Sequence, residues 1–144
     1  MKIFKRFLPA ALACTLLLSA PARAAEDPSH FQLSASIMEK LKSAEADMKA
    51  LQKTDELEAD VDPDRSIEAA IRKIDKDPQT VAVLAKHGLS GRDLVMSAHA
   101  LLHAGTFVQL EKSGDQKAAE LYRGYTKEQQ ANIDLIRDIL KGPK

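Results

Sequence analysis

The stretch that decides the fold is residues 89–112, LSGRDLVMSAHALLHAGTFVQLEK. Ser90 is followed three residues later by Asp93, a pair typical of the capping box that begins a helix. Gly114 lies just beyond Lys112 and is typical of a helix end. These signals predict one helix of about six turns over residues 90–112.

Apolar residues surround this predicted helix instead of forming a single stripe. One broad face holds Leu94, Val95, Ala98, Leu101, Leu102, Gly105 and Val108. The other side also carries large apolar residues, with His99, His103 and Thr106 as its polar members. A helix that is apolar most of the way round is usually covered on several sides. We therefore expect residues 90–112 to form the centre of the domain, with Ala98 and Leu102 buried.

The N-terminal segment has the three-part plan of a secretory signal peptide. Basic residues come first, an apolar run follows over residues 7–18, and Ala22-Arg23-Ala24 matches a cleavage site. The apolar run is shorter than the roughly 20 residues that span a bilayer. We expect residues 1–24 to be removed, leaving no stable membrane span and a periplasmic or secreted protein. Lipidation of Cys14 is the alternative, although the apolar run continues beyond that residue.

Composition excludes several classes for the predicted mature chain, residues 25–144. Removal of four basic residues with the leader leaves 17 basic and 21 acidic residues, so this chain is mildly acidic. That charge gives no electrostatic basis for binding nucleic acid. Cys14 is the only cysteine and lies in the leader, which excludes disulfides and thiolate metal sites from the mature domain.

Further helices are predicted on both sides of the central one. An outer helix is expected over residues 31–53, a short pair over 67–76 and 78–87, and a last helix that Thr126 and Gln129 begin with a second capping box. Either Asp64 or Ser66 caps the first of the pair, and Asp77-Pro78 begins the second. Residues 54–65 read as an acidic linker. The prediction is a single all-α domain, an irregular bundle of three main helices and a short helix pair around residues 90–112.

Two resemblances accompany these patterns. The run from Asp77-Pro78 to Leu89-Ser90-Gly91, followed by an Ala/Leu-rich helix and Ala131-Asn132-Ile133, resembles uncharacterised small secreted helical proteins of Gram-negative bacteria. The segment over residues 125–130, YTKEQQ, is similar to the LTxxQ element of CpxP/Spy-type periplasmic chaperones, although a second copy of that element is absent. The first resemblance implies a shared fold, and the second implies binding to envelope proteins.

No arrangement of residues typical of catalysis is found in the sequence. Ser90 and Thr126 are explained as helix caps, the acidic residues cluster on predicted solvated faces and in the linker, and no glycine-rich phosphate loop occurs. We therefore expect a binding or accessory protein of the envelope and not an enzyme, with no cofactor.

The alternative function is metal binding on the central helix. Met96, His99 and His103 are spaced i, i+3 and i+7, which places them within about 60° of one another around a helix. Two imidazoles one turn apart can share a metal ion, and a thioether is a soft ligand that suits Cu(I), with Zn(II) a poorer fit. The alternative is a structural role, in which both histidines are half-buried polar residues and Met96 fills space between the helices.

Overall fold

The computed structural model describes residues 27–52 and 65–142, and within them the chain is helical with no strand. The all-α class predicted from the sequence is confirmed. Over these described residues the elements are one 3₁₀ turn and six α-helices: η1 Pro28–His30, α1 Ala35–Gln52, α2 Ile67–Asp75, α3 Pro78–Lys86, α4 Gly91–Lys112, α5 Ala118–Gly124 and α6 Lys127–Lys141. The predicted leader and all of the predicted linker except Arg65 lie outside the described residues. No helix in the described ranges is both long enough and apolar enough to cross a membrane.

Local side-chain signals set the helix boundaries. At the start of α4, Ser90 Oγ accepts a hydrogen bond from the Asp93 amide at 3.1 Å, and the Asp93 carboxylate accepts one from the Ser90 amide at 2.9 Å. Thr126 and Gln129 form the same reciprocal box at α6. Ser66 caps α2 and Asp77 caps α3. Between α3 and α4, Gly88 has a φ of 64°, a left-handed conformation that glycine adopts without strain.

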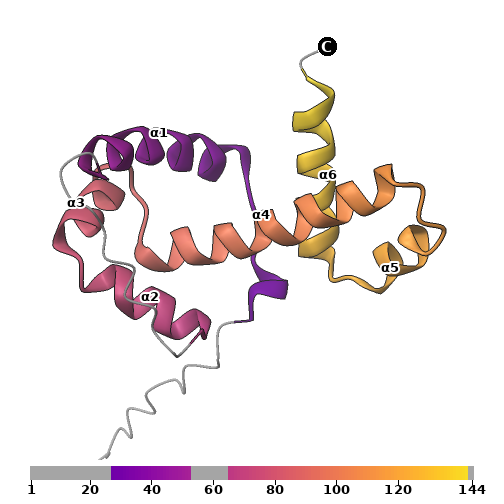
Figure 1. Cartoon of the computed structure of the whole chain (residues 1–144), viewed down its shortest axis with the longest axis horizontal. Coiled ribbons are helices and arrows are strands. Elements are labelled where there is room, and N and C mark those ends of the chain that lie inside the picture. The colour runs from indigo at the N-terminus through magenta and orange to yellow at the C-terminus, as the bar shows by residue number, and fades with distance from the viewer. Residues whose placement is uncertain (1–26, 53–64, 143–144) are drawn as a thin grey trace, which may run out of the picture.

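The other described helices are arranged around α4, which runs through the middle of the molecule (Figure 1). The N-terminal half of α4 is covered by α2, and α6 crosses its C-terminal half and makes the most extensive helix contact in the fold. Helix α1 packs mainly on α3, so it lies beside the N-terminal half of α4 with little direct contact. The central position predicted for residues 90–112 is therefore confirmed.

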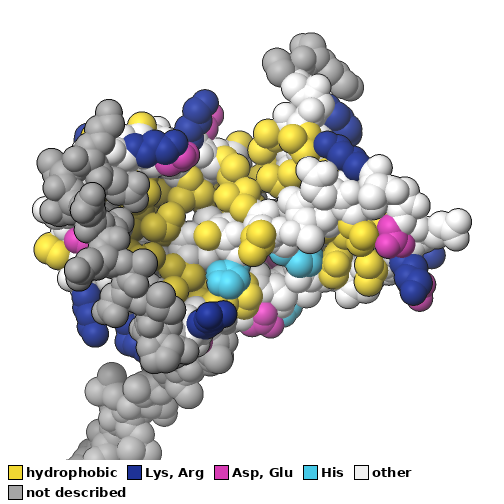
Figure 2. Space-filling view, viewed as in Figure 1, with side chains coloured by type: hydrophobic (Ala, Val, Ile, Leu, Met, Phe, Trp, Pro, Cys, Tyr) yellow, Lys and Arg dark blue, Asp and Glu magenta, His cyan; other side chains and the backbone are white. Residues whose placement is uncertain are grey.

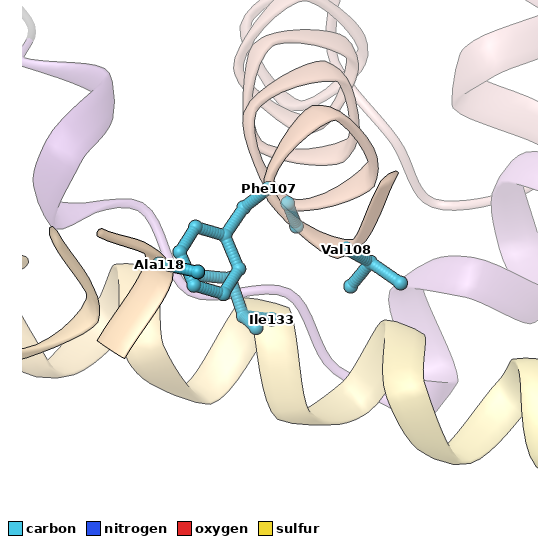
Figure 3. Close-up of a cluster of buried hydrophobic side chains, with 5 residues drawn as sticks. Phe107, Val108, Ala118 and Ile133 are labelled. Carbon is cyan, nitrogen blue, oxygen red and sulfur yellow. The ribbon is translucent and has the colours of Figure 1, made fainter. Parts of the chain in front are cut away.

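Two separate hydrophobic clusters hold the bundle. The larger one lies where α4, α5 and α6 meet, and Figure 3 shows the Phe107 ring directed toward Ala118 and Ile133. The smaller one joins α1, α3 and the α3–α4 corner through Ala44, Leu84 and Leu89. All of these side chains are less than a tenth exposed. Helix α4 is the element that connects the two clusters.

The buried side of α4 differs from the expected one. Met96, Ala100 and Phe107, which belong to the opposite side, are at most 4% exposed, whereas Leu102 is 70% exposed and Ala98 is also exposed. One cause is the position of η1 and α6, which pack on the side of α4 that carries Ala100. The prediction that Ala98 and Leu102 are buried was wrong.

The first long helix begins later than predicted. The expectation was a helix from Phe31, but α1 begins at Ala35, and residues 31–34 are not helical. The Asn132 side chain on α6 binds the backbone of Phe31 and Leu33, and this contact replaces the first turn of the expected helix.

Candidate functional site

The first candidate site is an exposed apolar surface on α4 and α6. Leu102 lies in the middle of α4 with 70% of its area exposed, and Ile139 and Leu140 on α6 are 51% and 55% exposed. Leu101 and Gly105 continue this row along α4 as half-buried residues. Figure 2 shows apolar side chains gathered on the faces of α1, α4 and α6 around the hollow that these helices enclose. A contiguous apolar patch is the usual mark of a docking surface, whereas single exposed apolar residues are common on folded proteins.

The exposure of this surface follows from how the helices cross. Ile133 lies at the crossing of α4 and α6 and is completely buried, and the C-terminal half of α6 continues past α4 (Figure 1). The apolar positions one and two turns beyond the crossing, Ile136 and Leu140, therefore become progressively more exposed. Helix α1 does not cover them, because it is packed against α3.

The second candidate site is a cavity of about 220 Å³ between η1, α4 and α6. Its lining residues are Asp27, Pro28, Ser29, His99, Ala100, His103, Gln129 and Asn132. The two predicted histidines thus lie on one wall of the same cavity. The third predicted ligand is not part of this lining, because Met96 is 1% exposed and belongs to the core of α4.

The surroundings of the histidines are polar on one side and aromatic on the other. The His103 ring meets the Tyr125 ring edge-on, with 4.6 Å between the centroids. Across the cavity, the Asp27 carboxylate accepts a hydrogen bond from the Ser29 amide at 2.9 Å. The hydrogen bond of the Ser29 side chain, followed by this backbone bond, lowers the pKa of Asp27 below its ordinary value. In the part of the chain that the structure describes, no group of three or more His, Cys, Asp or Glu side chains is placed to hold a metal ion.

The wall formed by η1 is held in place by a clasp that we define as Asn132 with the backbone of Phe31 and Leu33. Asn132 Oδ1 accepts a hydrogen bond from the Leu33 amide at 2.7 Å, and Asn132 Nδ2 donates one to the Phe31 carbonyl at 2.8 Å. The side chain is 1% exposed. Thr126 Oγ1 adds a hydrogen bond to the Ser29 carbonyl, and His30 lies 3.5 Å from the Glu128 carboxylate.

A charged network fixes α6 against the end of α4. The Arg137 guanidinium makes hydrogen bonds of 2.6 and 3.0 Å to the Glu111 carboxylate and one of 2.7 Å to Asp134. It also lies over the rings of Phe107 and Tyr122, at 5.7 and 4.9 Å from their centroids. The hydrogen bonds to Glu111 are the main reason that the pKa of Arg137 is raised. Since every donor group is directed at a partner within the fold, we read this network as structural.

A second polar contact joins α1 to the end of α3. The Asp47 carboxylate accepts hydrogen bonds from Lys86 Nζ at 2.8 Å and is 2.9 Å from His87 Nε2. The bond from Lys86, followed by that from His87, lowers the pKa of Asp47. His87 is therefore held far from the histidine cavity, to whose lining it does not contribute.

Sequence reasoning missed Asn132 and Arg137 as organising residues. Asn132 has one visible signal, since it is a polar residue beside Ile133 on the side of α6 that faces the bundle. Its partners are 99 and 101 residues away, so the sequence alone does not indicate them.

Comparison with known proteins finds no match: no family model, curated protein or solved structure is similar to this chain. The two candidate sites therefore have to be interpreted from their own chemistry.

Proposed function

We propose that the protein is a small helical binding protein of the bacterial envelope, and that its surface on α4 and α6 takes an apolar helical segment of another protein. The observation that carries this proposal is the 70% exposure of Leu102 in the middle of the central helix. Contact between a large apolar side chain and water is unfavourable in free energy. Covering the side chain with a partner removes this contact and therefore favours binding. No catalytic role is part of the proposal.

The spacing of the surface favours a helix as the partner. Ala98, Leu102 and Gly105 follow one another at intervals of four and three residues, so they form a row along α4. Helix-in-groove recognition uses such rows, with apolar anchors of the bound helix at similar spacing. Figure 2 shows further apolar side chains around the hollow that α1, α4 and α6 enclose.

The location in the envelope rests on the leader-like residues 1–24. Similarity of residues 125–130 to CpxP/Spy-type chaperones supports a partner among envelope proteins. Intact mass measurement of protein exported by a Gram-negative host tests the location. We expect a chain that begins after Ala24, whereas an uncut chain or a lipidated Cys14 would contradict this part of the proposal.

The binding proposal is tested by fluorescence anisotropy with a labelled amphipathic helical peptide that has leucine at every third or fourth position. We expect Leu102→Glu combined with Leu140→Glu to weaken binding by more than about tenfold, equivalent to about 1.4 kcal/mol. The fold should survive, because both side chains are more than half exposed in the free protein.

Matched controls are available at other exposed apolar residues. Val81→Glu on α3 and Leu121→Glu on α5 add the same charges at side chains that are 37% and 42% exposed. They should bind the peptide as the wild type does. The proposal fails if the wild type does not bind, if the controls lose binding equally, or if sedimentation shows that a second copy of the chain covers Leu102.

A further inference from the structure

We propose that His99 and His103 form a two-histidine site for a divalent transition-metal ion, Cu(II) above all, in the cavity between η1, α4 and α6. The two residues are one helical turn apart on α4, and both line the cavity of about 220 Å³. Imidazoles separated by four residues on a helix can bind one ion together. Leu102 does not line this cavity, and the inference makes no use of the proposed docking surface.

The protein supplies two nitrogen ligands and water completes the shell, because no third His, Cys, Asp or Glu among the described residues is placed to join them. The opposite wall of the cavity is polar, with Asp27, Ser29 and the amide side chains of Gln129 and Asn132. Both amide side chains already accept backbone hydrogen bonds, Gln129 from Thr126 and Asn132 from Leu33. Asp27 is the carboxylate among the lining residues, and its negative charge favours a cation over an anion in this cavity.

The identity of the metal follows from this ligand set. Because Met96 is buried in the core and does not line the cavity, no soft thioether is available to select Cu(I). Imidazole nitrogen with oxygen ligands suits Cu(II), Ni(II) and Zn(II), and Cu(II) binds most tightly among these ions for a given site. Mg²⁺ and Ca²⁺ prefer shells made of oxygen alone and are not expected to compete.

One of the two imidazoles is held in place before any ion binds. The edge-on contact of His103 with Tyr125 restricts rotation of the His103 ring. His99 is exposed and lies one turn earlier on the same rigid helix. A ligand that is already oriented loses less conformational entropy on binding, which favours a specific site over scattered surface coordination.

The test is calorimetric titration of Cu(II) into the untagged protein, with electron paramagnetic resonance to detect nitrogen ligands. We expect one ion per chain with a Kd on the order of 1 μM, and two coupled imidazole nitrogens. His99→Ala and His103→Phe should each weaken binding by more than about tenfold, and the second variant keeps a ring against Tyr125. Lowering the pH should release the ion, because a histidine must be deprotonated to bind it.

His87→Ala serves as the control, because His87 does not line the cavity and is held at Asp47. It should leave the affinity and the spectrum unchanged. The proposal is overturned if His99→Ala and His103→Phe bind Cu(II) as tightly as the wild type, or if His87→Ala weakens binding to the same extent. Absence of any wild-type binding tighter than about 10 μM would also overturn it.

Discussion

Substitution of Asn132 tests how the N-terminal segment is held to the rest of the fold. In the clasp, Asn132 both accepts from the Leu33 amide and donates to the Phe31 carbonyl, at 2.7 and 2.8 Å. Asn132→Leu keeps the branching of the side chain, although leucine is larger, and leaves both backbone groups without a partner. Each unsatisfied buried group costs about 1–3 kcal/mol, and the Phe31 carbonyl is only partly buried, so we expect a loss of about 2–4 kcal/mol.

Asn132→Asp introduces a charge at the same position and keeps the shape of the side chain. The carboxylate can still accept from the Leu33 amide, but it cannot donate to the Phe31 carbonyl, and it places a charge where the side chain is 1% exposed. A buried charge without a partner costs about 3–5 kcal/mol, so this variant should be less stable than Asn132→Leu at pH 7. That loss is a large part of the 5–15 kcal/mol typical of a whole domain.

The pH dependence of the Asp variant has a defined sign. Burial favours the neutral acid, so the pKa of the introduced carboxyl is higher in the folded state than the value of about 3.9 expected in the unfolded chain. The folded state then binds more protons, and the stability of the variant relative to wild type falls as pH rises through this interval. Near pH 4 the protonated acid can donate to the Phe31 carbonyl, and much of the loss should be recovered.

Urea unfolding followed by circular dichroism at both pH values measures these differences, and hydrogen exchange of the Leu33 amide reports the clasp directly. Gln109→Glu, at an exposed position on α4, is the control and should change stability by less than about 0.5 kcal/mol. Wild-type stability of Asn132→Asp at pH 7, or unchanged protection of the Leu33 amide in either variant, would refute the reasoning.

Three further predictions concern small residues of α4. Gly105→Ala should stabilise the protein by up to about 1 kcal/mol, because a Cβ there meets no atom within 4 Å and alanine is the better helix former. Gly91→Ala should stabilise the protein less than Gly105→Ala, because its Cβ would lie 3.0 Å from Ile74 Cγ2 and would force the exposed Asp75 side chain, 2.5 Å away, to rotate; equal shifts in Tm for the two variants would contradict this contrast. Ser97→Ala should raise Tm, because the Ser97 hydroxyl is fully buried without a hydrogen-bond partner among the residues described, and a lower Tm would show that the hydroxyl has a stabilising contact.

The sequence predicted the parts of the fold that depend on neighbouring residues. Capping pairs such as Ser90 with Asp93 lie within one turn, so their geometry follows from spacing alone. The buried side of α4 could not be predicted in the same way, because a helix that is apolar all round has no periodicity that selects one face. The choice was made by the helices that pack on α4, chiefly α6 and α2, which left Leu102 exposed.

The contrast between features set by neighbouring residues and features set by distant ones also applies to the candidate sites. The pairing of His99 with His103 was visible as a four-residue spacing, whereas the wall opposite them comes from η1 and α6, which are distant in sequence. Met96 has the right spacing for a third ligand but points into the core, since helical spacing gives a direction and not the depth of burial. Asn132 was missed because its partners are 99 and 101 residues away.

The separation between Asn132 and its partners also has a kinetic consequence. Residues 67–141 form α2 to α6, whose principal contacts join neighbouring or next-neighbouring helices. Such local contacts form rapidly during folding, whereas the clasp closes a loop of about one hundred residues and loses the corresponding chain entropy. We therefore expect η1 and its clasp to dock after the transition state, so that the N-terminal segment sets how long the native protein lasts before it unfolds, and not how quickly it forms.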